Sequence, residues 1–150
     1  MLTIAAIVSI VAVVNAVVPS VGRTTGALIS ASGTVEDRIA SQVEIVHATG
    51  IDADPDADVW VKNIGASTVD SLDRVDVFFG PEGDFQRIPQ GDPGCTAPCW
   101  EYSIENATTW EPTATLHIMV HASNDLATGT TYYVKVVTPN GVADSRYFTV

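Results

Sequence analysis

Charge is absent from the first 22 residues of this chain, and basic side chains are scarce throughout. Lys and Arg number 7 against 18 Asp and Glu, and the formal net charge is −11. A chain with so few cations has little with which to neutralise phosphates, so no nucleic-acid partner is expected. Such acidity instead suits a soluble protein surface.

Cysteine is also scarce, with Cys95 and Cys99 as the two copies. A zinc site needs four ligands, usually from two paired clusters, and the sequence has no second pair. A thioredoxin-like motif has two residues between its cysteines, whereas CTAPC has three. We therefore expect a loop-closing disulfide, which requires an oxidising compartment.

The uncharged run MLTIAAIVSIVAVVNAVVPSVG is about long enough to cross a bilayer as a helix. Four interpretations compete: a cleaved secretory signal, a buried helix, a transmembrane anchor and the N-terminal helix of a type IV pilin-like subunit. A signal peptide has a basic region before its apolar core, and no basic residue precedes this run. A buried helix rarely stays apolar on every face over such a length.

A pilin-like helix first lies in the membrane and then packs against its own copies. Ala, Ser and Gly are interspersed among the Val and Ile residues, and small residues let helices approach closely. We expect residues 1–41 to form this hydrophobic helix. The residues expected to make its assembly contacts are Ile4, Ile7, Ile10, Val11, Val14 and Val18.

From about residue 42 the apolar period changes to two, which predicts β-strands in a domain of residues 42–150. About eight short strands alternate with turn signals such as GPEGD and PNG, which favours an immunoglobulin-like antiparallel sandwich. The predicted fold class is α+β, a long N-terminal helix followed by this sandwich. The expected core is Val59, Val61, Val75, Val77, Phe79, Ile104, Leu116, Ile118, Val120, Tyr133, Val137 and Phe148.

Three groups of residues invite a metal or ligand interpretation. His117 and His121 would share one face of a strand but lie roughly 13 Å apart, too far to bind one metal. The run DADPDAD at 52–58 suggests calcium but lacks the glycine and glutamate of an EF-hand, so a solvated acidic turn is the simpler interpretation. Core and interface packing accounts for the tryptophans, Trp60, Trp100 and Trp110.

Asn106 lies in an Asn-Ala-Thr acceptor pattern and is the candidate glycosylation site. The sequence contains no nucleophile elbow, phosphate-binding loop or catalytically spaced His and carboxylate cluster. We therefore expect a protein that is not an enzyme and that uses no cofactor or metal.

The order of several motifs resembles the archaellum accessory protein FlaG and its relatives, the type IV pilins and archaellins. The motifs are DVWVKNIG at 58–65, LDRVDVFFG at 72–80, FQRIP at 85–89, WEYSIENATTWEPTATLHI at 100–118 and GTTYYVKVVTPNGVADSRYF at 129–148. The resemblance implies a hydrophobic helix carrying an immunoglobulin-like sandwich, in the archaellum machinery. One departure is Ala5, because many pilin-like subunits have glutamate near the fifth mature position.

Together these features predict a structural subunit of an archaellum-like or pilus-like surface filament, built through the N-terminal helix. Its expected partners are copies of itself and other archaellum or pilus components. We expect it to be inserted in the membrane before assembly and extracellular afterwards. The alternatives are a membrane-anchored stator element, as the resemblance to FlaG implies, and a membrane-tethered adhesin or binding module.

Overall fold

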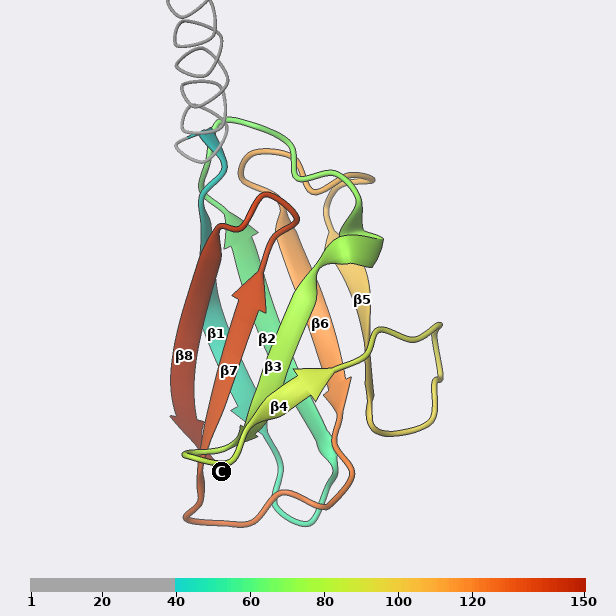
Figure 1. Ribbon diagram of the computed structural model, residues 1–150, viewed down its shortest axis with the longest axis vertical. Coiled ribbons are helices and arrows are strands. Elements are labelled where there is room, and N and C mark those ends of the chain that lie inside the picture. The colour runs from blue at the N-terminus through green and yellow to red at the C-terminus, as the bar shows by residue number, and fades with distance from the viewer. Residues whose placement is uncertain (1–39) are drawn as a thin grey trace, which may run out of the picture. The chain divides into compact units, whose positions relative to one another are not determined.

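A computed structural model describes residues 40–150 of the chain (Figure 1). These residues form strands and one 3-10 turn at Leu72–Arg74. The strands are β1 (Val43–Gly50), β2 (Asp56–Asn63), β3 (Asp76–Pro81), β4 (Gln86–Ile88), β5 (Cys99–Glu105), β6 (Thr115–His121), β7 (Thr131–Val137) and β8 (Ala143–Thr149).

The strands form two four-stranded sheets that pack face to face (Figure 1). One sheet has the order β1-β2-β6-β5 and the other β4-β3-β7-β8, with antiparallel pairing throughout both. Side chains of successive strand residues point to opposite faces, so each sheet contributes one face to a shared core. This arrangement is the predicted sandwich.

The core consists of the alternate strand residues whose side chains point between the two sheets. β6 shows it most clearly, because Leu116, Ile118 and Val120 are fully buried while the residues between them are partly exposed. Trp100 and Trp110 are almost fully buried. Burying a large apolar side chain contributes about 1.5–3 kcal/mol, so these positions dominate the stability of the domain.

Most of the expected core residues are buried, but the prediction was wrong for β7. Tyr132, Val134 and Val136 face the core, whereas Tyr133 and Val137 lie on the outer face. Lys135 lies on that outer face together with Tyr133 and Val137, so the charged residue marks the exposed side that the prediction overlooked. Ile104 and Phe148 are only partly buried and pack against the edge of the core.

The predicted α+β fold class was wrong for the described part of the chain, which is an all-β sandwich. The helical component of that prediction rested on residues 1–41, nearly all of which lie outside the described residues. From Val43 onward, where apolar residues recur at every second position, the chain forms strands. Within residues 40–150, no helix has the length and hydropathy that crossing a membrane requires.

Candidate assembly surfaces

The predicted site residues fall into two groups. The assembly residues Ile4, Ile7, Ile10, Val11, Val14 and Val18 lie outside the described residues. The others lie in the sandwich: Cys95 and Cys99 form a disulfide in the β4–β5 loop, and Asn106 is exposed in the turn after β5.

Asn106 has a left-handed backbone, with φ of 60°, a conformation that Asn adopts more readily than most residues. Its exposed position in a turn is compatible with a glycan. The assignment of a glycan to Asn106 stays a prediction.

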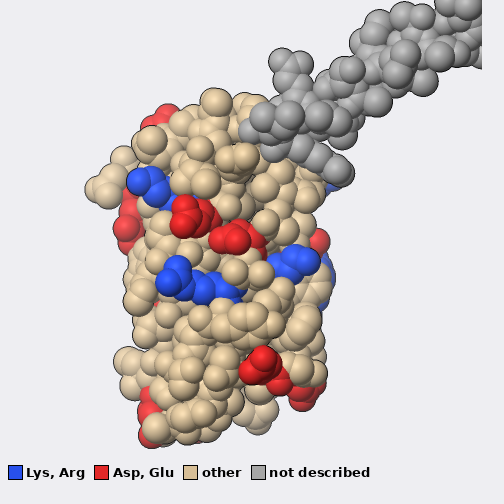
Figure 2. All heavy atoms as spheres, turned by 90° about the vertical axis from the view of Figure 1, so that its left-hand side faces the viewer, with Lys and Arg blue, Asp and Glu red and all other residues tan. Residues whose placement is uncertain are grey.

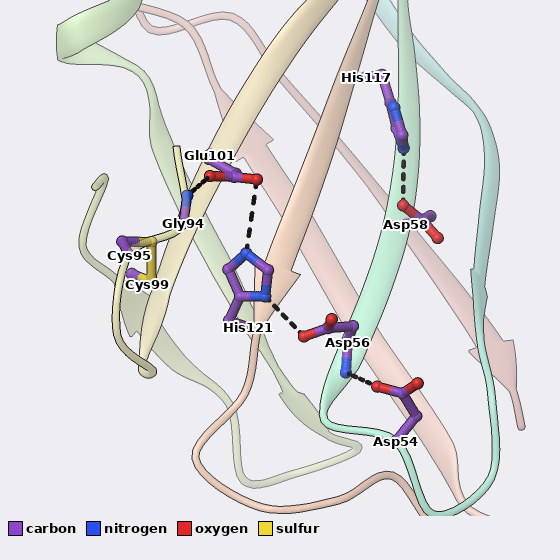
Figure 3. A network of polar contacts seen from close by, with 9 residues as sticks. All are labelled: Asp54, Asp56, Asp58, Gly94, Cys95, Cys99, Glu101, His117 and His121. Atoms are coloured by element: carbon purple, nitrogen blue, oxygen red, sulfur yellow. Dashed lines mark hydrogen bonds and ion pairs between the residues drawn. A yellow bond between two sulfur atoms is a disulfide. The ribbon is translucent and has the colours of Figure 1, made fainter. Parts of the chain in front are cut away.

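The four carboxylates of the predicted acidic turn diverge rather than converge. Only Asp52 and Asp54 lie in the turn, where they accept hydrogen bonds from the N–H groups of Thr128 and Asp56 respectively. Asp56 and Asp58 belong to β2, and each contacts a histidine of β6 (Figure 3). With each carboxylate directed to a different partner, this segment does not form a calcium-binding loop of the EF-hand kind.

The histidine contacts follow from the pairing of β2 with β6. His121 is the register partner of Asp56, and its Nδ1 lies 2.6 Å from Asp56 Oδ1. His117 Nε2 lies 2.7 Å from Asp58 Oδ1. His117 and His121 share one face, as predicted, and each pairs with its own carboxylate rather than with one common metal.

Trp60 extends this polar face, with a histidine ring on each side of its indole. Its indole stacks on His117 at 4.5 Å between ring centroids, lies 5.3 Å from His47 on its other side and donates its N–H to Glu105. The outer face of this sheet therefore carries ordered aromatic and ionisable groups, which can recognise a partner.

The opposite sheet carries an exposed aromatic patch. Tyr133 on β7 contacts Phe85 and Tyr147, at 4.5 and 4.9 Å between ring centroids. Phe85 and Tyr147 are 46% and 56% exposed. Large exposed aromatic side chains are common at protein interfaces, so this patch is a candidate contact surface.

β1 and β8 close one edge of the sandwich, where the two sheets meet (Figure 1). The register of β1 shifts between Ile45 and His47, which is the sign of a β-bulge. β8 satisfies the polar groups there, because Ile45 N–H donates to Asp144 Oδ2 and Arg146 donates to the carbonyls of Ile45 and Val46. We call this set of contacts the β1–β8 seam.

The face that contains the β1–β8 seam has both signs of charge (Figure 2). Lysine and arginine side chains form a band across its middle, with acidic side chains above and below. In a chain of net charge −11, such a band is the natural place to receive an acidic surface of a partner.

The described residues thus form an all-β sandwich whose outer faces carry aromatic and charged side chains. The chain belongs to the archaeal-type flagellin family, because the model of that family matches residues 1–148. This membership supports a structural, non-enzymatic role in an archaellum-type surface appendage. The comparison with curated protein sequences gives no match.

Two solved structures from Sulfolobus acidocaldarius are similar to the sandwich. The archaellum periplasmic stator protein FlaG is 27% identical, with a TM-score of 0.62 over 72% of this chain and 99% of that chain. A chain of the FlaF and FlaG stator complex is 26% identical, with a TM-score of 0.63 over 71% of this chain and 88% of that chain.

The archaeal flagellum of Methanospirillum hungatei strain JF1 has a TM-score of 0.68 over 99% of this chain and 90% of that chain. The identity is 14%, so this similarity concerns the fold. The resemblance that the motifs indicated, to archaellum proteins, is confirmed by these comparisons and by the family match.

Proposed function

We propose that this chain is a structural subunit of an archaellum-like surface filament, polymerising through its uncharged N-terminal segment. The observation that carries the proposal is the extent of the family match, which spans the apolar start and the β domain as one unit. A filament subunit needs both parts, one to pack against its copies and one to form the outer surface.

The contacts of the N-terminal segment would come from Ile4, Ile7, Ile10, Val11, Val14 and Val18. The physical reason is that an uncharged surface of this length is stable only among lipid or other apolar surfaces, so the segment would lie in the membrane before assembly. Polymerisation would then replace lipid contacts by contacts between copies.

The sandwich would supply contacts at a larger radius. The aromatic patch of Phe85, Tyr133 and Tyr147 and the basic band on the seam face are the candidate surfaces for them. Neighbouring copies are acidic overall, so the basic band would reduce their mutual repulsion.

The second candidate function is a membrane-anchored stator element. It is favoured by the similarity to the stator protein FlaG, which at 27% identity covers nearly the whole of that chain. Such a protein would hold its partner outside the membrane and would be present in few copies per appendage.

Deletion of the gene, with complementation, tests both roles. A filament subunit gives cells without filaments, and a stator element gives cells that keep filaments but do not swim. Wild-type swimming and wild-type filaments in the deletion strain would contradict both and favour a tethered binding module.

A further inference from the structure

The disulfide lies in a corner that contains other metal-binding side chains, where the β4–β5 loop meets β5 and β6 (Figure 3). Cys99 is the register partner of His121, and Glu101 follows two residues later on the same outer face. Cys95 Sγ, a carboxylate oxygen of Glu101 and a ring nitrogen of His121 all lie within 4.8 Å of one another. We call these four residues the cysteine corner.

His121 is oriented as a metal-ligating histidine would be. Its Nδ1 lies 2.6 Å from Asp56 Oδ1, and an ionised carboxylate only accepts hydrogen bonds, so Nδ1 carries the proton. In the neutral ring, Nε2 then has a free lone pair. A histidine ligand whose other ring N–H donates to a carboxylate is the usual arrangement around protein-bound zinc.

The surroundings of His121 Nε2 favour a cation. This atom is buried and has no hydrogen-bond partner among the described residues, and Glu101 Oε1 lies 3.8 Å away. A lone pair and a carboxylate oxygen repel each other at this distance unless a proton or a metal ion lies between them. Glu101 is itself held in place by a hydrogen bond from the N–H of Gly94.

The distances suit a small tetrahedral ion. Zinc binds sulfur at about 2.3 Å and nitrogen or oxygen at about 2.0–2.2 Å, which places neighbouring ligand atoms about 3.3–3.8 Å apart. For one nitrogen and one oxygen ligand the expected separation is about 3.3–3.6 Å, so His121 Nε2 and Glu101 Oε1, at 3.8 Å, would move slightly closer together to bind one ion. Cys95 Sγ already lies within 4.8 Å of both atoms, and the two sulfurs, bonded to each other in the disulfide, would move apart on reduction to act as separate ligands.

We propose that, when Cys95 and Cys99 are thiols, this corner binds one zinc ion through Cys95, Cys99, Glu101 and His121, with Asp56 positioning the histidine. The thiol state exists before the disulfide forms. Zinc then displaces the two thiol protons, which pass to solvent, and two Zn–S bonds form. In the disulfide state each sulfur is bonded to the other, so neither can act as a thiolate ligand.

The two states exclude each other, and both attach the β4–β5 loop to β5. Zinc would therefore hold the loop in place while protecting the thiols, and oxidation would release the ion. Sequence reasoning missed this set because His121 joins Cys99 and Glu101 only through the pairing of β5 with β6.

The test uses the full-length protein in detergent, in its disulfide form and after reduction by a phosphine. The phosphine takes oxygen from one water and becomes a phosphine oxide, while the disulfide gains the two electrons and the two protons. Zinc affinity is measured by competition with a chromophoric chelator, and cobalt serves as a spectroscopic substitute. We expect one zinc per reduced chain, bound at least 100-fold more tightly than by the disulfide form, and a thiolate-to-cobalt absorption band.

Variants assign the ligands. We expect His121→Asn and Glu101→Gln to weaken zinc binding by the reduced protein 10- to 100-fold, and Asp56→Asn to weaken it about 10-fold. His117→Asn is the matched control, because His117 lies on the same strand and also pairs with an aspartate. It should bind zinc like the wild type.

Three results would overturn the proposal. The first is equal zinc affinity in the reduced and disulfide forms. The second is a loss of zinc affinity in His117→Asn as large as that in His121→Asn. The third is zinc binding that occurs only after the β-sheet circular dichroism signal is lost. Circular dichroism of each variant in the disulfide form separates ligand loss from unfolding.

Discussion

Asn63 shows, at the residue scale, how one buried polar side chain organises several loops. It is fully buried at the end of β2. Its Nδ2 donates to the carbonyls of Ser67 and Trp110, and its Oδ1 accepts from Gly65 N–H. The side-chain amide of Asn63 thus hydrogen-bonds three backbone groups. The need for a polar side chain at this buried position follows from the fold and not from any local sequence pattern.

We expect Asn63→Ala to destabilise the protein by roughly 1–3 kcal/mol, because a fully buried side chain loses its three hydrogen bonds to the backbone. Asn124→Ala is the control, since Asn124 is exposed. Urea unfolding of both variants provides the measurement. Equal midpoints for Asn63→Ala and the wild type would contradict this role of the side chain.

Asp52 makes a residue-scale prediction about pH. The backbone N–H of Thr128 donates to Asp52 Oδ1, and this hydrogen bond holds the pKa of the carboxyl below its usual value of 3.8. Folding therefore favours the ionised form. The contribution is complete above pH 3.8 and is lost as the pH falls through the folded-state pKa.

Asp52→Asn should accordingly lower stability at pH 7 and have a smaller effect below pH 3. Denaturant midpoints at both values measure the difference, with Asp125→Asn as an exposed control. An effect of Asp52→Asn that is the same at both pH values would contradict the assignment.

At the element scale, the β1–β8 seam replaces ladder hydrogen bonds by side-chain contacts. Ile45 is 2% exposed, and its N–H donates to Asp144 of the other sheet. We expect Asp144→Ala to cost roughly 1–3 kcal/mol and to speed hydrogen exchange of the Ile45 amide, because that N–H loses its acceptor. The control is Asp76→Ala on the exposed side of β3, where Ile45 exchange should stay slow. Unchanged exchange in Asp144→Ala would contradict the role of the seam.

The elements also show how far sequence reasoning extends. The eight strands were predictable because β-branched and aromatic residues alternate between clear turn signals. The inward face of β7 was predicted wrongly, because Tyr133 and Val137 are large and apolar although they share their face with Lys135. The bulge in β1, the histidine–aspartate pairs and the cysteine corner depend on long-range register, which no local pattern of this chain encodes.

At the scale of the whole molecule, the β domain should fold without the apolar segment. The described residues begin at Ala40, whose carbonyl accepts hydrogen bonds from the N–H groups of Ala66 and Ser67. We expect a fragment of residues 37–150 to unfold cooperatively and to be more stable than one of residues 42–150, which lacks these two bonds. Thermal unfolding followed by circular dichroism compares them, and a 37–150 fragment without a cooperative transition would contradict this expectation.

The central claim concerns the whole molecule: the chain builds a filament through its N-terminal segment. The most direct measurement is the protein composition of filaments sheared from cells that express either the wild type or Ile10→Asp, with Thr3→Ser as a mild control in the same segment. A charge among packed apolar segments is costly, so the account predicts wild-type filaments made mainly of this chain and none from Ile10→Asp. Normal filaments that contain Ile10→Asp, or wild-type filaments that lack this chain, would contradict it.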